Sequence, residues 1–444
     1  MNKTDFSRKR KQPFGGMLLF MVNFLKKSLV IEIDSFVNFL NSKSNLSSVK
    51  KFTKSAFVQK RMKINPAVFK YLSQVIIENT YTESNTTIKR FYGFRILSVD
   101  GSKLTLPNTE ELKEEFGESK NQTNTGVVQA RISVLCDVLN SELDKLETGE
   151  RIMALKHSIQ WKKNDLIIYD RGYPSYDFKY EHIKAEIDYL IRVKTSHSKI
   201  VQCFVDSGEK AIVTEIFPQE KHSFIGKDYN KNSPLRVRLV RVDLPSGEVE
   251  VLMTSLLDSE KYPTKIFKEL YFMRWGIETF YDELKNKLKV GCFTGYSKIS
   301  ILQDFFCAIF ISNLQSIIVN DLQEELNIKN HNTKLNYKIN GNLSYGFLKN
   351  RILELLTKEA ALEDIFKELQ NLFIQNTIPI RPNRNNKRNV DRYRTRIKPL
   401  VLKNQKDAIK QFLNLLTLTA RVYSRHRFFR GKVSKFQLVQ IPYW

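Results

Sequence analysis

The segment 271–285 places a carboxylate among cationic and phenolic side chains at helical spacing. On a continuous α-helix four of its side chains would lie within about 60° of one another: Tyr271, Arg274, Glu278 and Lys285. An adjacent apolar stripe would pack against the protein. A carboxylate beside Arg and Lys suits holding a metal ion against a phosphate while the cations bind the phosphate backbone. Taken alone, the segment fits an amphipathic surface helix with internal ion pairs equally well.

Two aspartates lie at the ends of predicted strands. Asp100 follows the run 94–99 and precedes a glycine, and Asp170 ends the apolar run 165–170. Ligand sites gather at the carboxyl ends of strands in open α/β sheets, although Asp before Gly is also an ordinary turn residue. With Glu278 they would supply three hard oxygen donors, which suit Mg²⁺ or Mn²⁺. Two such ions about 4 Å apart would activate an attacking water or hydroxyl and stabilise the leaving 3′ oxygen at phosphorus.

The elements that would position these residues change character along the chain. Helical periodicity predicts a helical domain over residues 1–90. Its predicted helices span 17–27, 30–41, 46–60 and 65–79. From residue 93 a predicted hairpin of strands 94–100 and 103–106 is followed by further strands and helices, which indicates a mixed α/β sheet.

A second change of pattern follows residue 198. Residues 198–256 contain four predicted strands, the first at 199–205, and would form a β-rich insertion between two parts of a catalytic core, 91–197 and 257–330. The remaining residues, 331–444, are predicted to form a helical and basic C-terminal region. The predicted fold class is therefore α/β, with helical regions at both ends.

The charge is concentrated at the ends of the chain. The 444 residues carry a net charge of +25. Residues 1–90 contain 17 basic and 5 acidic residues, residues 381–444 contain 17 and 2, and the centre is almost neutral. This distribution predicts polyanion contacts at the ends and chemistry in the middle.

Specific cations are candidates for those contacts. In a basic helical pair near residues 47–63, a helix-turn-helix would place Lys54, Lys60 and Arg61 near a DNA groove, and a solvated basic helix is the competing interpretation. In the C-terminal region the candidate DNA-backbone contacts are Arg384, Arg388, Arg392, Arg394 and Arg396. A disordered tail is the alternative there.

The cysteines and apolar runs exclude other classes. The four cysteines are scattered without a C-x-x-C pair: Cys136, Cys203, Cys292 and Cys307. We therefore expect neither a zinc site nor a disulfide framework, and we expect the thiols to lie in a reducing cytoplasm. The apolar run 305–319 is short and is interrupted by polar residues, which indicates a buried helix rather than a membrane span. No membrane partner is expected.

Three motifs in order resemble the DDE transposases of the bacterial insertion-sequence-four family. They are Asp100-Gly-Ser, the run 165–170 followed by Arg-Gly-Tyr173, and the pattern Tyr271-x2-Arg274-x3-Glu278-x6-Lys285. The last is similar to that family's Y-R-E-K signature, and the likeness covers most of the chain.

The resemblance implies a ribonuclease-H-like core in which Asp100, Asp170 and Glu278 bind two Mg²⁺ ions, with Mn²⁺ as a substitute. It implies that Tyr271, Arg274 and Lys285 contact DNA phosphate, with Trp275 beside them. Trp275 could stack on an extruded base, and a core tryptophan is the alternative.

The same resemblance implies cut-and-paste transposition by a homodimer that bridges two DNA ends. A nick at a terminal inverted repeat would free a 3′ hydroxyl, which forms a hairpin, and the reopened end would then join target DNA. The alternatives are a metal-dependent nuclease on the same fold and a catalytically inactive DNA-binding regulator of transposition. We expect the protein to act in the bacterial cytoplasm, at the nucleoid.

Overall fold

The computed structural model describes residues 13–23, 28–43, 50–81, 90–120, 126–136, 140–145, 149–219, 224–329, 335–357 and 362–381. The chain divides into two units, 1–385 and 386–444, and every element below belongs to the first. The predicted basic cluster 384–396 and the helical pattern after it lie outside the described residues.

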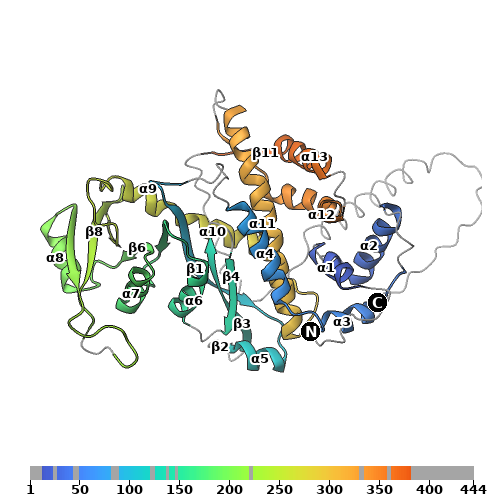
Figure 1. Cartoon of the computed structure of the whole chain (residues 1–444), viewed down its shortest axis with the longest axis horizontal. Helices are drawn as coiled ribbons and strands as arrows, with labels where there is room; N and C mark the ends of the chain where they lie inside the picture. The colour runs from blue at the N-terminus through green and yellow to red at the C-terminus, as the bar shows by residue number, and fades with distance from the viewer. Residues whose placement is uncertain are drawn as a thin grey trace, which may run out of the picture. The chain divides into compact units, whose positions relative to one another are not determined.

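The helices are spread along this unit (Figure 1). They are α1 (Phe14–Val22), α2 (Leu29–Lys43), α3 (Lys54–Arg61), α4 (Ala67–Thr80), α5 (Glu110–Phe116), α6 (Glu150–Lys156), the 3-10 turn η1 (His157–Gln160), α7 (Tyr176–Lys184), α8 (Lys199–Ser207), α9 (Ile266–Phe272), α10 (Trp275–Asp282), the π-helical turn η2 (Glu283–Lys287), α11 (Lys298–Lys329), α12 (Gly341–Thr357) and α13 (Leu362–Gln375). The helices predicted before residue 80 are confirmed, with shifted ends.

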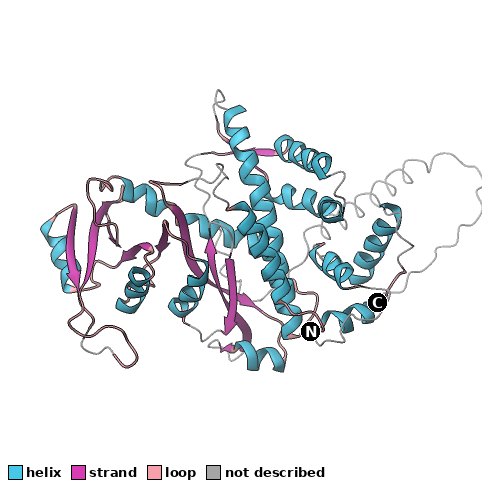
Figure 2. Ribbon diagram, viewed as in Figure 1, coloured by secondary structure: helices cyan, strands magenta, loops and turns pink. Residues whose placement is uncertain are grey.

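The strands among the described residues form one nine-stranded mixed sheet and one small pair. They are β1 (Arg95–Thr105), β2 (Glu118–Lys120), β3 (Gly126–Cys136), β4 (Asn140–Lys145), β5 (Asp165–Tyr169), β6 (Asp188–Val193), β7 (Ala211–Ile216), β8 (Leu235–Asp243), β9 (Val249–Thr254), β10 (Tyr337–Ile339) and β11 (Thr377–Pro379). The large sheet has the order β2-β3-β1-β5-β6-β9-β8-β7, with β4 also paired to β3. Figure 2 shows the strands of the large sheet on one side of the unit, and α11 to α13 with the small pair β10-β11 on the other. The predicted mixed α/β class is confirmed.

The parallel strands β1, β5 and β6 form the centre of this sheet. All five residues of β5 are buried, as expected for a strand covered on both faces. A buried ion pair fixes its register against β1: Arg95 donates from Nε and Nη2 to the two carboxylate oxygens of Asp165, at 2.7 and 2.6 Å. A two-pronged contact of this kind specifies geometry as well as energy.

The predicted hairpin around Asp100-Gly-Ser is wrong. β1 continues through Gly101 and pairs with β3 from Ser98 to Thr105. The glycine serves a close approach rather than a turn, because a Cβ at position 101 would lie 3.0 Å from Cγ of Glu150. Asp100 therefore lies within a long strand, at the level where its neighbour β5 ends.

The predicted strand 199–205 is also wrong, because these residues form α8. Ser198 caps this helix by accepting a hydrogen bond from the Val201 amide, and Val201 and Phe204 bury the face at i and i+3. Strands β7, β8 and β9 are present as predicted. They extend the central sheet, since β9 pairs with β6.

The N-terminal helices share a hydrophobic core with the helices that follow the sheet. Met17 and Phe20 of α1 belong to the same buried cluster as Ile277 of α10 and Phe305 of α11, and α4 packs along α11. The predicted apolar stripe beside the carboxylate face, which runs past residue 285, is confirmed here, since its residues are buried in this cluster: Ile277, Tyr281, Leu284 and Leu288. The predicted boundaries between a DNA-binding domain, a catalytic core and an insertion stay predictions.

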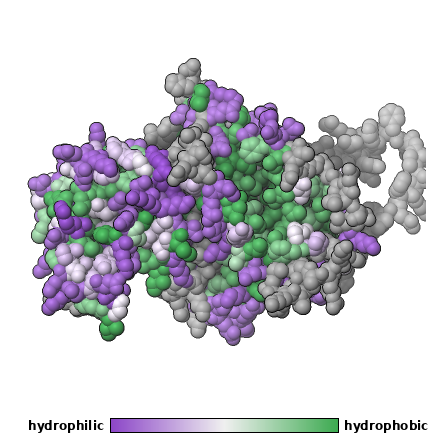
Figure 3. All heavy atoms as spheres, viewed as in Figure 1, coloured by the Kyte–Doolittle hydropathy of each residue, from purple (hydrophilic) through white to green (hydrophobic). Residues whose placement is uncertain are grey.

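Helix α11 contains the apolar run 305–319. It is the one helix in the described residues that is long and apolar enough to cross a membrane, yet 72% of its most apolar window is buried inside the protein. Figure 3 shows hydrophobic residues gathered over this helical part and hydrophilic ones spread over the strand-rich part. Burial by α4, α12 and α13 makes α11 a core helix.

Candidate active site

Asp100 and Asp170 lie side by side at the centre of the sheet. The parallel register pairs Arg95 with Asp165 and continues to Val99 and Tyr169. The next residue on each strand is an aspartate, and neighbouring strands are about 4.8 Å apart. The sequence placed both residues at a sheet edge, and the register brings them together.

The environment of Asp100 opposes its negative charge. Burial raises the pKa of its carboxyl above the ordinary value, and the carboxylates of Asp170 and Glu150 raise it further. A hydrogen bond from the Gly101 amide and the positive charge of Arg274 act in the opposite direction. Excess negative charge of this kind is what a divalent cation neutralises.

Helices α9 and α10 lie across the ends of these strands and are held there, together with η2, by three hydrogen bonds. The Tyr271 hydroxyl donates to Oδ1 of Asp170 at 3.3 Å. The Tyr281 hydroxyl donates to the Asp100 carbonyl at 2.8 Å, and Lys285 Nζ donates to Ser102 Oγ at 2.5 Å. Two side chains of segment 271–285 therefore reach the aspartates or their strands. Tyr271 contacts Asp170 itself, and Lys285 contacts the strand that carries Asp100.

The segment 271–285 is not one continuous helix. α9 ends at Phe272, α10 begins at Trp275, and the π-helical turn η2 follows. The i,i+4 relationship at the start of α10 survives, because Arg274 Nη2 donates to Oε1 of Glu278 at 2.8 Å. The Arg274 side chain is buried and its guanidinium lies 5.0 Å from the Trp275 ring centroid.

Two of the three predicted carboxylates are placed to bind a divalent cation, and the third is paired with an arginine. Asp100 and Asp170 offer adjacent, partly buried hard oxygen donors. Glu278 is paired with Arg274 instead, and the described residues contain no group of three or more His, Cys, Asp or Glu side chains placed to hold a metal ion. The Glu278 side chain is 45% exposed and that of Arg274 is 8% exposed, so the carboxylate is the end of this ion pair that is open to solvent.

Trp275 is 52% exposed, which excludes the core-tryptophan interpretation. Its indole borders a cavity of about 510 Å³ beside Tyr271 and Arg274. The same cavity has apolar, cationic and acidic walls, among them Phe272, Lys265, Lys268, Glu250 and Glu269. An aromatic face beside cations can bind a base together with its phosphate.

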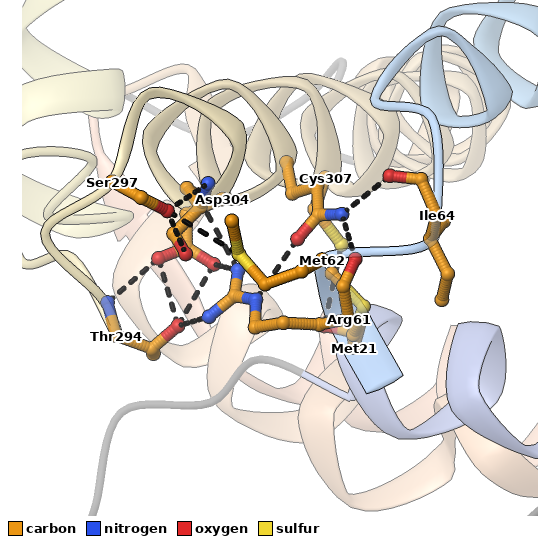
Figure 4. Close-up of polar contacts among 10 residues, drawn as sticks. Met21, Arg61, Met62, Ile64, Thr294, Ser297, Asp304 and Cys307 are labelled. Atoms are coloured by element: carbon orange, nitrogen blue, oxygen red, sulfur yellow. Dashed lines mark hydrogen bonds and ion pairs between the residues drawn. The ribbon is translucent and has the colours of Figure 1, made fainter. Parts of the chain in front are cut away.

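Arg61 does not face a DNA groove. It is 1% exposed and forms a buried network with α11 and the preceding loop (Figure 4). Its guanidinium donates to Gln303 Oε1 at 2.9 Å, to Asp304 Oδ1 at 2.8 Å and to Thr294 Oγ1 at 2.6 Å. The prediction that Arg61 binds DNA is therefore wrong, because tertiary partners use its hydrogen-bonding capacity.

Of the remaining predicted DNA contacts, two lie on the described helix α3 and five lie outside the described residues. Lys54 begins α3 and is exposed, and Lys60 of the same helix is partly exposed. Both stay predictions. The C-terminal cations lie outside the described residues: Arg384, Arg388, Arg392, Arg394 and Arg396.

The sequence pattern does not reveal Glu150. This residue begins α6 and belongs to no motif, yet it lies against Gly101 and influences Asp100. No spacing rule finds it, because the path of the chain from β3 to α6 decides where it lies. Ser102 follows Asp100 in the first motif, but its bond to Lys285 is a tertiary contact.

A match to a known protein family agrees with this geometry. A family model described as the transposase DDE domain matches residues 92–314, half of the chain, and spans Asp100, Asp170 and Glu278. The chain belongs to the DDE transposases. The protein is accordingly a polynucleotidyl transferase and endonuclease that acts on DNA, and enzymes of this family use divalent metal ions.

A comparison with solved structures finds the piggyBac transposase in a synaptic complex with hairpin DNA. The similarity covers 82% of this chain and 86% of that chain, at 10% sequence identity and a TM-score of 0.35. A search of curated protein sequences found no match.

Proposed function

We propose that this DDE transposase belongs to the bacterial insertion-sequence-four family and moves an insertion sequence by cut-and-paste. The observation that carries the proposal is the convergence of the signature segment on the aspartates: Tyr271 bonds Asp170, and Tyr281 and Lys285 bond the strand of Asp100. Local spacing alone does not produce this convergence, since the segments are more than 100 positions apart.

A ribonuclease-H-like core is supported by the topology. Strands β4, β3 and β1 are antiparallel neighbours, and β5 and β6 continue the sheet parallel to β1. The strand order β4-β3-β1-β5-β6 places Asp100 on the central strand and Asp170 at the end of the next one. The resemblance in sequence implies the same arrangement.

The proposed metal ligands are Asp100, Asp170 and Glu278. We propose two Mg²⁺ ions, for which Mn²⁺ substitutes. When bound, they supply Lewis-acid stabilisation and a deprotonated nucleophile for displacement at phosphorus. The protein's own part is to hold the two aspartates in register, to orient Asp170 through Tyr271, and to keep Arg274 within reach of Glu278.

The cationic side chains would bind the DNA backbone next to these carboxylates. Arg274 offers a forked contact to phosphate and Lys285 a point charge. Trp275 is exposed beside the 510 Å³ cavity, which supports stacking on a base extruded from a bent strand. Lys54, Lys60 and the C-terminal arginines would extend the contact away from the site.

The proposed reaction begins with a nick at a terminal inverted repeat. The freed 3′ hydroxyl attacks the opposite strand and forms a hairpin, which a second hydrolysis opens before the 3′ end joins target DNA. A homodimer bridging two ends is the proposed active form. The proposed location is the bacterial cytoplasm, at the nucleoid.

A strand-resolved cleavage assay tests the proposal. The full-length protein is mixed with labelled duplexes from both ends of the element that encodes it, with Mg²⁺, with Mn²⁺ or with EDTA. A metal-dependent nick at the element boundary followed by a hairpin is the expected result. A duplex of scrambled terminal sequence is the control.

Other outcomes would favour the alternatives. Metal-dependent cutting without hairpin or strand-transfer product would indicate a nuclease on this fold. Tight end binding with no cut in either metal would indicate a regulator. The intact carboxylate set argues against the regulator, because a protein that only binds DNA does not need it.

A further inference from the structure

A fourth carboxylate lies against the two aspartate strands. A Cβ built on Gly101 would lie 3.0 Å from Glu150 Cγ and 3.1 Å from its Oε1, and a Cβ on Gly172 would lie 3.7 Å from its Oε2. The Glu150 carboxylate therefore lies between the backbone that follows Asp100 and the backbone that follows Asp170. Glycine at position 101 leaves room for this approach.

Glu150 forms an ion pair with Arg131 in which the carboxylate is the more exposed end. Arg131 Nη1 on β3 donates to Glu150 Oε1 at 2.5 Å, and the two side chains are 18% and 44% exposed. Glu150 is thus held beside the site by Arg131.

A buried hydroxyl points to a ligand at the same place. The Tyr173 side chain is 1% exposed, and its hydroxyl has no hydrogen-bond partner in the described part of the chain. The Tyr173 amide donates to the Asp170 carbonyl at 3.2 Å, which holds this residue beside the second aspartate. Burial raises the pKa of the phenol, and the charges of Asp100, Glu150 and Asp170 raise it further. A buried hydroxyl without a hydrogen-bond partner is destabilising, and a bound group that accepts its proton would remove this cost.

We propose that Glu150 and the Tyr173 hydroxyl bind the water shell of the divalent cation held by Asp100 and Asp170. Mg²⁺ keeps several of its waters in proteins and loses them reluctantly, so it needs hydrogen-bond partners beyond its direct ligands. Glu150 accepts hydrogen bonds from such waters, and Tyr173 donates one to a carboxylate or water oxygen at the site. This inference rests on the proposed function, because it requires the two aspartates to bind a cation.

The Tyr173→Phe variant tests the hydroxyl, with Tyr189→Phe as its matched control. Both phenols are buried in the same cluster, and neither hydroxyl has a partner among the described residues. Because neither substitution removes a hydrogen bond, urea unfolding of both variants should match the wild type or show slightly higher stability. Mn²⁺ titration of the full-length protein, followed by the electron paramagnetic resonance signal of free Mn²⁺, should show several-fold weaker binding for Tyr173→Phe alone.

The Glu150→Gln variant tests the carboxylate, with Glu368→Gln as its control. Glu368 forms an ion pair with Arg351 of the same length, 2.5 Å, on the helices α12 and α13. Substitution at position 150 should weaken Mn²⁺ binding about ten-fold, the usual effect of removing a group outside the first ligand sphere. Substitution at position 368 should leave Mn²⁺ binding unchanged.

The wild-type titration separates the two proposals. If the wild type binds Mn²⁺ and Asp170→Asn abolishes that binding, while Tyr173→Phe and Glu150→Gln bind as the wild type does, the role of Glu150 and Tyr173 is overturned and the proposed function stands. If the wild type binds no Mn²⁺ and cuts no DNA, both proposals fail.

Discussion

The Tyr271 hydroxyl donates a hydrogen bond to Asp170 across 101 positions of sequence. This bond links the first residue of segment 271–285 to the second aspartate, so the phenol is placed to orient a carboxylate. Burial and the charge of Asp170 raise the pKa of the Tyr271 phenol, which keeps it a hydrogen-bond donor at neutral pH.

Replacing Tyr271 by phenylalanine should slow cleavage more than it weakens DNA binding. Removal of a group that orients a metal ligand typically costs about ten-fold or more in activity. Single-turnover nicking rates and end-binding affinity should be measured together. Tyr176→Phe is the control, because its hydroxyl bonds the Ser233 carbonyl far along the chain, and equal losses in the two variants would contradict an orienting role.

Replacing Glu278 by alanine should abolish cleavage and leave DNA binding nearly unchanged. The substitution removes the proposed ligand, while Arg274 becomes free to bind phosphate. The control is Glu283→Ala, which breaks another i,i+4 ion pair in the adjoining turn, with Lys287. Nicking by Glu278→Ala at the wild-type rate would refute the assignment of this residue as a ligand.

Lys285→Ala should weaken end binding and flatten its salt dependence. Removing one bond to a DNA phosphate reduces the slope of log affinity against log salt by roughly 0.9. Lys285 also bonds Ser102, so a purely structural role would change cleavage without changing the slope. Lys329→Ala on the surface of α11, where the lysine pairs with Glu325, supplies the comparison at each salt concentration.

The parts of the sequence prediction that the structure keeps are the local ones. The spacing of Arg274 and Glu278 follows from helical periodicity, which is local, and the structure keeps it. Asp before Gly101 predicted a turn, but the glycine is needed for the close approach of Glu150, a residue 49 positions away. Such approaches depend on the path of the whole chain and leave no local pattern.

The same distinction explains the errors at residues 61 and 199. Arginine is a residue type that often contacts DNA, yet the guanidinium of Arg61 donates hydrogen bonds to Asp304 and Gln303, more than 240 positions away. In α8 the β-branched residues favour a strand by propensity, whereas the Ser198 cap and the burial of one face favour a helix. Tertiary burial prevailed over residue type in both places.

Replacing Arg61 by methionine should destabilise the fold rather than alter DNA recognition. Removing one partner of a buried ion pair costs roughly 3–5 kcal/mol, because Asp304 is left without its cation. Urea denaturation of Arg61→Met should therefore have a clearly lower midpoint, while that of Lys54→Met at the exposed start of the same helix should not. Normal stability with abolished DNA binding would restore Arg61 as a DNA-binding residue.

Acidification should destabilise the protein through His182 in the window between pH 6.5 and 4. The ring is fully buried: Nδ1–H donates to the Phe178 carbonyl at 2.7 Å and Nε2 accepts from the Tyr169 hydroxyl at 2.8 Å. Burial lowers the pKa of His182 to about 4, although the bond to Phe178 opposes the change.

The sign of this effect follows from the proton balance. Below its ordinary pKa of about 6.5 the unfolded chain binds a proton that the folded protein refuses, so stability falls as the pH falls. Between pH 7.5 and 5.5 the free energy of unfolding should drop by about 1 kcal/mol for this residue. Urea denaturation at the two pH values checks this, and His182→Gln should lose that part of the drop. An equal drop in wild type and variant would mean that other groups, such as the similarly buried His157, account for it.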